Sequence, residues 1–286
     1  MIGKRIFVSD IPYRIEGKIG HGLHSIVYGA RDLYSGEYVA IKIISFASGS
    51  ASNQQVFQKE LDMLLYLQEL NSYVIRVFNY DYNERYGVIV MEYGKTLRDT
   101  FVSYVISGTR MPPSLIRSFW SQMIQAIYYM HQIGIVHADC KPENFIQVGP
   151  GGTSLRLIDM GISFQLPSNM TSRLHTAAGT PDYVSPEMVN ARAGLGSQSK
   201  YGYKSDIWAL GIILFEMTFG FRPLQNLGGN RTKLTFLARL TTRDIVVPNH
   251  PDTDLYDIIR WCLRSNPRRR PTIEQILNHP YLTRKR

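Results

Sequence analysis

The chain of 286 residues is 44% hydrophobic and 19% charged, and it carries a formal net charge of +9. It is long enough for one large or two modest globular domains with a substantial core. Its longest apolar run, residues 207–215, is too short to span a bilayer and predicts a buried helix, and residues 1–5 lack the apolar stretch of a secretory signal. We therefore expect an intracellular protein, cytoplasmic or nuclear, with no membrane partner.

The net charge indicates which partners to expect, and the two cysteines indicate the redox compartment. A net charge of +9 favours anionic partners such as nucleotides or acidic protein segments. The basic clusters at 268–270 and 284–286 are short and no nucleic-acid-binding module is recognisable, so we expect no nucleic-acid partner. Cys140 and Cys262 are far apart without metal-ligand spacing, which fits a reducing compartment. Cys140 is either a reactive thiol or, as is commoner, a small residue facing the interior.

The first strands surround a glycine-rich turn. Residues 15–20 and 25–30 have strand character, and between them lies Gly20-His21-Gly22-Leu23-His24-Ser25. Glycines allow the backbone to close over phosphates, with amide N–H groups directed at the anion. A simple hairpin turn is an equally good interpretation of this segment.

A lysine lies inside the next apolar strand, residues 39–44. A buried ammonium group is costly unless an anion meets it, so Lys42 predicts an anionic partner. The candidates are a nucleotide phosphate and a carboxylate on the helix expected over residues 53–70, where Glu60 is the first choice and Glu69 the fallback. The apolar face of that helix would comprise Phe57, Leu61, Leu64 and Leu65.

The balance of strands and helices changes near residue 91. An apolar strand over 86–91 ends at Met91-Glu92-Tyr93-Gly94. Before this point the chain has mainly strand character with one helix, and after it mainly helical character. We therefore predict an α+β protein with a small antiparallel-sheet lobe, a larger and mainly helical lobe, and a ligand-binding cleft between them.

The amphipathic helix predicted over residues 114–131 leads into the loop His137-Ala138-Asp139-Cys140-Lys141-Pro142-Glu143-Asn144. This loop carries side chains suited to moving a phosphoryl group. Asp139 can accept the proton of a hydroxyl group, Lys141 can neutralise phosphate charge, and the Asn144 oxygen can hold a hard cation.

A hairpin of strands 145–148 and 154–158 is predicted next, and Asp159-Met160-Gly161 follows it. An aspartate at the end of an apolar strand, followed by a flexible glycine, can coordinate Mg²⁺ that bridges phosphates. The alternative is an ordinary turn aspartate.

Taken in order, these motifs resemble those of the eukaryotic protein kinases, over residues 13–282. The matching pieces are G-x-G-x-x-S-x-V at 20–27, V-A-I-K at 39–42, Glu60, H-A-D-C-K-P-E-N at 137–144, D-M-G at 159–161, S-P-E at 185–187, Asp206 before an apolar helix, and N-P-R-R-R-P at 266–271.

Within the kinases the chain is most similar to the monopolar-spindle, or TTK-type, dual-specificity kinases of the spindle checkpoint. Casein-kinase-like enzymes share parts of the pattern and are an alternative. The matching segments are residues 90–94, 131–139, 157–159, 179–183, the polar insert before 204–208, and 279–281.

The resemblance implies a nucleotide site in the small lobe. Lys42, held by Glu60, would bind the α- and β-phosphates of ATP. Gly20, His21, Gly22 and Ser25 would lie over the phosphates, and Val27, Ala40 and Ile146 would lie on the faces of adenine. The Glu92 carbonyl and the Gly94 amide would hydrogen-bond the edge of adenine, and Met91 would guard the pocket behind it.

The resemblance also implies the catalytic groups and the domain limits. Asp139 would be the base, Lys141 would stabilise the transferred phosphoryl group, and Asn144 with Asp159 would hold two Mg²⁺ ions. Structural roles would fall to Asp206 under the loop and to a buried Glu187–Arg270 ion pair. The expected divisions are an extension at 1–12, a kinase domain at 13–282 with a small lobe (13–91), a hinge (92–94) and a large lobe (95–282), and a basic tail at 283–286.

Three residues depart from the family pattern. Ser25 replaces the third glycine, Met160 replaces a phenylalanine, and Ala138 replaces the arginine that usually pairs with a phosphorylated activation loop. They motivate a catalytically silent pseudokinase scaffold as the alternative to an enzyme. Activity is favoured because the base, the phosphate lysine and both metal ligands are retained.

We expect phosphate transfer from ATP to Ser or Thr hydroxyls of proteins, and the TTK-type resemblance adds Tyr as an acceptor and a role in the mitotic spindle checkpoint or chromosome segregation. Autophosphorylation is expected in the loop 159–187, within residues 171–176. Thr180 would bridge Asp139 and Lys141, and the insert 190–203 is expected to be an exposed loop.

Overall fold

The computed structural model describes residues 1–22, 25–46, 51–176, 181–190, 198–240 and 244–284. The chain divides into two compact units. Unit 1 comprises Met1–Lys95 and Ile146–Gly161, and unit 2 comprises Thr96–Phe145 and Ile162–Arg286. Strands dominate unit 1 and helices dominate unit 2, which confirms the predicted α+β class.

Unit 1 is built on one antiparallel sheet of six strands in the order β1-β2-β3-β4-β6-β5. The strands predicted from the sequence over 15–20, 25–30, 39–44 and 86–91 are all present. Strand β1 pairs with β2 and was not predicted, because its four residues show no clear alternation. The bounds are β1 Arg5–Val8, β2 Ile11–His21, β3 Ser25–Asp32, β4 Tyr38–Ser45, β5 Val77–Tyr82 and β6 Tyr86–Glu92.

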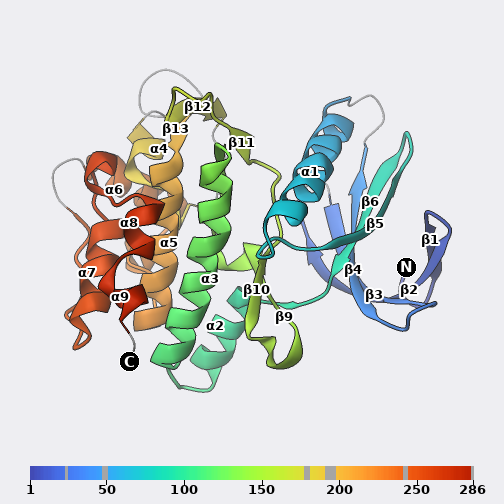
Figure 1. The fold of residues 1–286 in the computed structure, drawn as a ribbon, viewed down its shortest axis with the longest axis horizontal. Coiled ribbons are helices and arrows are strands. Elements are labelled where there is room, and N and C mark those ends of the chain that lie inside the picture. The colour runs from blue at the N-terminus through green and yellow to red at the C-terminus, as the bar shows by residue number, and fades with distance from the viewer. Residues whose placement is uncertain (23–24, 47–50, 177–180, 191–197, 241–243, 285–286) are drawn as a thin grey trace. The chain divides into compact units, whose positions relative to one another are not determined.

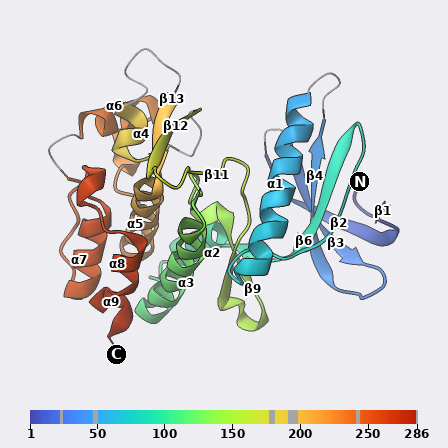
Figure 2. The same ribbon diagram turned by 45° about the horizontal axis from the view of Figure 1, so that its top comes forward.

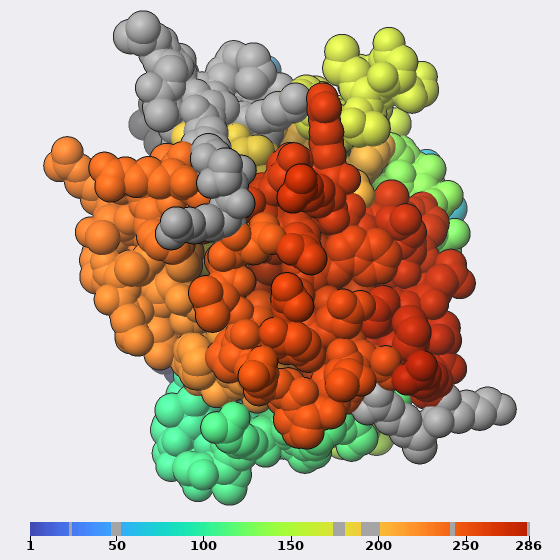
Figure 3. Space-filling view, turned by 90° about the vertical axis from the view of Figure 1, so that its left-hand side faces the viewer, coloured from blue at the N-terminus to red at the C-terminus, as the bar shows by residue number. Residues whose placement is uncertain are grey.

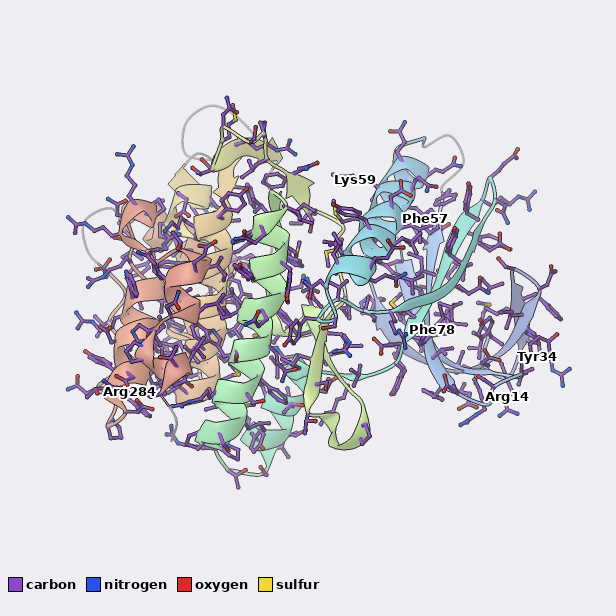
Figure 4. All side chains as sticks on the ribbon, in the orientation of Figure 1. Arg14, Tyr34, Phe57, Lys59, Phe78 and Arg284 are labelled. Atoms are coloured by element: carbon purple, nitrogen blue, oxygen red, sulfur yellow. The ribbon has the colours of Figure 1, made fainter. Side chains whose placement is uncertain are left out.

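The two faces of this sheet bury different residues. On one face an apolar cluster fills the curl of the sheet, formed by Val8, Tyr13, Ile15, Ala30, Val39, Ile41, Val88 and Val90. Helix α1 (Ala51–Leu70) covers the other face, as Figures 1 and 2 show. Figure 4 shows Phe57 on the sheet side of α1 and Lys59 on the opposite side.

The position of Phe57 explains why β6 carries a glycine, Gly87, near its start. The Phe57 ring is fully buried. Its centroid lies 5.6 Å from the ring centroid of Phe46 and 5.9 Å from that of Tyr82. A Cβ atom added to Gly87 on β6 would come within 2.5 Å of this ring. The sheet can therefore accept the aromatic side chain of α1 only where the strand carries no side chain.

A second sheet, in the order β10-β9-β7, contains the predicted hairpin. Its strands are β7 Lys95–Thr96, β9 Phe145–Val148 and β10 Ser154–Leu157. Within unit 1, Leu157 exchanges backbone hydrogen bonds with the segment after α1: its N–H donates to Tyr73 O at 2.8 Å, and its carbonyl accepts from Ile75 N at 3.0 Å. These bonds fix where the chain leaves β10, two residues before Asp159.

Unit 2 is organised around α5 (Tyr203–Phe219), which is buried from Ser205 to Thr218. The amphipathic α3 (Pro113–Gln132) lies beside α5, as both ribbon views show, and Trp120 Nε1 donates to Leu210 O at 3.1 Å. Both helices confirm the sequence predictions. Among the helices that the structure describes, none is long and apolar enough to cross a membrane.

The remaining helices surround this pair. In the face shown in Figure 3, α7 lies in the middle, with α6 on one side and α8 and α9 on the other. The bounds are α2 Leu97–Ile106, α4 Pro186–Asn190, α6 Asn230–Arg239, α7 Thr253–Cys262, α8 Ile273–Leu277 and α9 Pro280–Thr283, with short 3₁₀ turns at Pro142–Asn144, Pro150–Gly152, Gln225–Leu227 and Pro267–Arg269.

Two small strand pairs complete unit 2. Strand β8 (Ile135–Val136) pairs with β11 (Phe164–Gln165), and β12 (Ser172–Thr176) pairs with β13 (Gln198–Gly202). The expectation of a loop over 190–203 is therefore wrong for residues 198–202, while 191–197 lie outside the described residues. A pairing partner more than twenty residues away cannot be recognised from a polar, glycine-rich composition.

Candidate active site

The register of β3, β4 and β6 brings four predicted nucleotide-binding residues to one face of the unit 1 sheet. Val27 lies opposite Lys42, and Ala40 lies opposite Met91. Residues directly opposite each other in a sheet share a face, as do residues two apart in a strand. Val27, Ala40, Lys42 and Met91 therefore line the face that α1 covers.

Lys42 forms the predicted ion pair with Glu60 of α1. Its Nζ lies 2.5 Å from Glu60 Oε1, and the two side chains are 15% and 4% exposed. The fallback partner, Glu69, is exposed at the end of the helix. The structure thus confirms the sequence argument that a lysine inside an apolar strand requires a carboxylate on the next helix.

Asp159 supplies a second negative charge near this pair. Burial lowers the pKa of Lys42, but the charges of Glu60 and Asp159 outweigh it, so the pKa lies above its ordinary value. Burial raises the pKa of Glu60, against the opposing charge of Lys42, and Asp159 raises it further. Asp159 Oδ1 also accepts a hydrogen bond from Gly161 N at 2.9 Å, so the turn predicted as the alternative is present too.

The glycine-rich segment forms the turn of the β2–β3 hairpin. Gly20 lies opposite Val27, His21 lies opposite Ile26, and Gly22 N donates to Ser25 O at 2.8 Å. Residues 23 and 24 lie outside the described residues. The hairpin interpretation is therefore confirmed, and it is compatible with the predicted position over phosphates.

At the end of β6, the Glu92 carboxylate is bound by other groups of unit 1. Glu92 Oε2 accepts from Arg76 N at 3.1 Å and lies 3.5 Å from Arg156 Nε. A Cβ atom added to Gly94 would lie 2.4 Å from Gln147 O and 3.1 Å from Ile146 Cδ1. Gly94 is thus required by the close approach of β9, and a ligand at this strand end would meet the backbone of Glu92 because its carboxylate is already engaged.

Unit 2 carries the predicted catalytic loop. Lys141 Nζ donates a hydrogen bond to Asp139 Oδ2, and the two side chains are 20% and 14% exposed. Asn144 ends a 3₁₀ turn, and its Nδ2 donates to Asp139 O at 2.9 Å. The loop therefore presents a carboxylate, an ammonium group and a carboxamide together, as the D-x-K and D-x₄-N spacing predicts.

Asp206 of α5 holds this loop from within the unit, as predicted. It is 1% exposed, and its carboxylate accepts from the backbone N–H groups of His137 at 3.0 Å and Ala138 at 2.9 Å. The ring of His131 contacts it at 2.9 Å. Ala138 has φ +68°, a left-handed conformation that is strained for an L-residue, and the two hydrogen bonds to Asp206 stabilise it.

Cys140 has the buried position that was the commoner of its two interpretations. Its side chain is 1% exposed, and its Sγ lies 4.0 Å from Asp206 Oδ1. Burial, together with the charges of Asp206 and Asp139, raises the pKa of this thiol well above its ordinary value. The thiol therefore stays protonated, and the interpretation as a reactive thiol is wrong.

The Glu187–Arg270 ion pair is also present as predicted. Nη1 and Nη2 of Arg270 each lie 2.7 Å from one carboxylate oxygen of Glu187. The remaining guanidinium bonds go to the carbonyl oxygens of Lys204, Arg264 and Ser265. Arg270 thus ties α4, the start of α5 and the segment before α8 together.

Sequence reasoning missed one charged network in unit 2. Arg98 contacts Glu143, Tyr183 and Glu216, which lie 45, 85 and 118 residues away from it. No spacing rule connects positions so distant. The signal that could have drawn attention to it is Glu216, a carboxylate inside the most apolar helix of the chain. Thr180, which was expected to bridge Asp139 and Lys141, lies outside the described residues.

The proposed metal ligands suit a hard cation. Asn144 donates through its amide nitrogen, so its carboxamide oxygen is the end that could ligate a metal. Asp159 adds a carboxylate, and oxygen donors of these two kinds are those that Mg²⁺ prefers. The two residues belong to different units, and the described residues contain no cluster of three His, Cys, Asp or Glu side chains that could bind a metal.

Comparison with known proteins identifies the family. Residues 13–282 match the family described as the protein kinase domain, so the chain belongs to that family. It is 32% identical to the dual specificity protein kinase Ttk of Danio rerio over 98% of this chain and 27% of that protein. It is also 32% identical to the probable serine/threonine-protein kinase mps1 of Dictyostelium discoideum, over 96% of this chain and 28% of that protein.

These relatives agree with the resemblance found in the motifs. The Aurora kinase of Schizosaccharomyces pombe is 27% identical over 95% of this chain and 72% of that protein. The chain spans about a third or less of the length of its TTK and mps1 relatives. Membership of the protein kinase family implies ATP as the phosphate donor and a protein as the acceptor.

Proposed function

We propose that this chain is an active protein kinase of TTK type, which transfers the γ-phosphate of ATP to Ser and Thr hydroxyls of proteins and also accepts Tyr. Its proposed setting is the spindle checkpoint or chromosome segregation, with a location at kinetochores or the spindle. The motif resemblance and the names of its relatives support this proposal.

In unit 1 the residues are assigned to the nucleotide. Lys42 would bind the α- and β-phosphates, because its ammonium group is buried, charged and held in place by Glu60. The turn around Gly22 would cover the phosphates, and the backbone at Glu92 and Gly94 would hydrogen-bond the edge of adenine. The adenine faces would contact Val27, Ala40 and Ile146, and Met91 would guard the pocket behind the ring.

In unit 2 the residues are assigned to the acceptor. Asp139 would accept the proton of the incoming hydroxyl group, and Lys141 would balance the charge on the transferred phosphoryl group. Mg²⁺, held by Asn144 and Asp159, would neutralise phosphate charge when bound. The single observation that carries the proposal is the hydrogen-bonded set of Asp139, Lys141 and Asn144 on a loop braced by Asp206.

The test compares the wild-type chain with Asp139→Asn in a phosphotransfer assay with ATP, Mg²⁺ and a generic basic protein. A positioned base contributes about 10²–10⁴-fold, so the variant should lose about 3–5 kcal/mol of barrier lowering. ATP affinity, measured by calorimetry, should stay unchanged. Asp257→Asn is the matched control, because Asp257 is 71% exposed in the same unit and should leave the rate unaltered.

A silent pseudokinase is the second candidate, and Ser25, Ala138 and Met160 favour it. Met160 is 2% exposed, so this flexible side chain is part of the interior. If the wild-type chain binds ATP but phosphorylates neither itself nor the basic protein, this candidate replaces the first.

Autophosphorylation is proposed for the loop 159–187, within residues 171–176. Ser172–Thr176 forms strand β12, and Thr171 precedes it directly. Intact-mass measurement after incubation with ATP should show added phosphate that peptide mapping places there. An unmodified loop would contradict this proposal without affecting the one for protein substrates.

A further inference from the structure

Arg98 is the second residue of α2, and its guanidinium group is hydrogen-bonded to three other side chains of unit 2. Its Nε donates to Glu143 Oε1 at 2.8 Å, its Nη1 donates to Glu216 Oε1 at 2.7 Å, and its Nη2 donates to the Tyr183 hydroxyl group. The preceding Thr96 forms a capping box with Asp99, which fixes the first turn of α2. The guanidinium group is therefore held rigidly, with 22% of the side chain exposed.

The two carboxylates that Arg98 joins have different surroundings. Glu143 belongs to the catalytic loop, two residues after Lys141, and its side chain is 43% exposed. Glu216 is only 9% exposed on α5, and it accepts a further hydrogen bond from the Tyr183 hydroxyl group at 2.9 Å. Without Arg98, the protein would present two carboxylates next to each other at the edge of the catalytic loop.

This edge lies close to the proposed base. Glu143 is four positions after Asp139, and an extended chain covers at most about 3.6 Å per residue, so their Cα atoms lie within roughly 14 Å. A peptide whose hydroxyl group reaches Asp139 spans that distance with about four of its own residues. Side chains flanking the acceptor can therefore come into reach of Glu143.

The charges of the network are already balanced inside unit 2. Arg98 pairs with Glu143 and Glu216. Arg222 Nε also lies 3.8 Å from Glu216 Oε1, and Arg222 and Lys233 both pair with Asp182, so three basic side chains meet three carboxylates. Burial lowers the pKa of Arg98, but its hydrogen bond to Glu216 and the neighbouring charges outweigh this, so the pKa lies above its ordinary value. Burial and the charge of Glu216 raise the pKa of Tyr183, which keeps its hydroxyl group protonated as a donor.

We infer that Arg98 is a substrate-selecting residue, whose guanidinium group takes the place beside the catalytic loop that a basic substrate side chain would otherwise occupy. This inference rests on the proposed function, since it assigns the specificity of the same site. Arg98 is attached to the protein and already ordered, so a substrate arginine would have to displace it while being repelled by its charge. An Arg or Lys near the acceptor residue of a substrate should therefore not increase kcat/KM.

The experiment measures kcat/KM on peptides that share one acceptor serine and carry Arg, Ala or Glu at each of three positions on either side. Wild type should favour Arg over Ala by less than about twofold at every position. Arg98→Met should gain about tenfold for Arg at one or two positions, the effect of adding one charge-assisted hydrogen bond. Arg98→Lys, which reaches only one carboxylate, should gain about threefold.

Two further variants link the gain to the network. The double variant Arg98→Met with Glu143→Gln removes the exposed carboxylate and should lose most of the gained preference. Arg284→Met is the matched control, because Arg284 is an arginine of the same unit whose ion pair, with Asp254, lies outside the Arg98 network. Its peptide profile should match wild type.

The outcomes separate this inference from the proposed function. A wild-type preference for Arg of tenfold or more overturns the inference, and so does a folded Arg98→Met or Arg98→Lys variant with an unchanged profile. If no variant phosphorylates any peptide, the proposed function fails. Equilibrium binding of a fluorescent Arg peptide then decides the inference, since Arg98→Met should bind it about tenfold more tightly than wild type.

Discussion

Two buried cations, Lys42 in unit 1 and Arg270 in unit 2, each pair with a glutamate, and they differ in how many of their N–H groups are used. All five guanidinium N–H groups of Arg270 are matched by five hydrogen bonds, two of them to Glu187 and three to carbonyl oxygens. Within the described part of the chain, the ammonium group of Lys42 has one hydrogen-bond partner, Glu60, for its three N–H groups.

This difference separates a structural cation from one suited to a ligand. A saturated guanidinium group has no donor left, so Arg270 can only hold unit 2 together. Lys42 keeps donors and stays charged, although burial opposes its charge. An anion such as a phosphate would complete its hydrogen bonding, and we expect the protein to be most stable when that anion is present.

The largest expected effect is the loss of stability when Arg270, the cation with all its N–H groups bonded, is removed. Arg270→Ala removes the cation from the Glu187 carboxylate, which keeps a hydrogen bond from the Ser205 hydroxyl group, and removes the guanidinium donors of three carbonyl groups. This should cost about 3–5 kcal/mol of unfolding free energy. Denaturant unfolding measures it. The matched control is Arg268→Ala in the same basic run, where the side chain is exposed and the change should stay within about 0.5 kcal/mol. Equal effects of the two variants would contradict the structural role of Arg270.

The next largest effect concerns Lys42 and the stabilisation of the chain by ATP. ATP with Mg²⁺ at 100 times its dissociation constant should stabilise the wild-type chain by about 2.7 kcal/mol, seen as a rise in the unfolding midpoint. Lys42→Met should lose most of this rise at the same ATP concentration because the phosphates lose their cation. A full rise in the variant would show that Lys42 does not bind the nucleotide.

Asp206 extends the comparison to the catalytic loop. Asp206→Asn replaces a carboxylate that accepts two backbone N–H bonds, and hydrogen bonds to charged groups contribute roughly 1.5–3 kcal/mol, so the expected loss of stability is about 2 kcal/mol. The rate of phosphotransfer should fall as well. Asp257→Asn is the control, because the Asp257 side chain is 71% exposed and its contact with His279 should contribute little to stability. An Asp206→Asn variant with wild-type stability and a wild-type rate would contradict the proposal that Asp206 holds the catalytic loop in place.

The smallest effect concerns acid stability. Burial raises the pKa of Asp244, but hydrogen bonds from Ser265 N and Arg264 at 2.7 Å outweigh it, so the pKa lies below 3.8 in the folded protein. This contribution is present above pH 3.8 and disappears as the pH falls through the folded value. Asp244→Asn should cost at most about 1 kcal/mol at pH 7, because the side chain is a third exposed, and progressively less as the pH falls from 3.8 through the folded pKa. Unfolding curves across this pH range test it.

The sequence was sufficient for much of the fold and for the local groups of the candidate site. Apolar alternation located the strands around Lys42, and helical periodicity located α3 and α5. The Lys42–Glu60 pair followed from the cost of burying a charge. Strand β13 and the Arg98 network could not be found in this way, because each depends on partners that only folding brings together.

What the sequence by itself determined is the set of chemical groups: a base, a phosphate lysine, metal-binding oxygens and a glycine-rich turn, each defined by residues a few positions apart. Tertiary structure alone decided which charges remain available. It saturated Arg270, left donors on Lys42 and placed Arg98 between two carboxylates far away in the chain. The physical reason is that local spacing fixes which groups share a loop or a helix face, whereas hydrogen-bond saturation depends on every neighbour that the fold supplies.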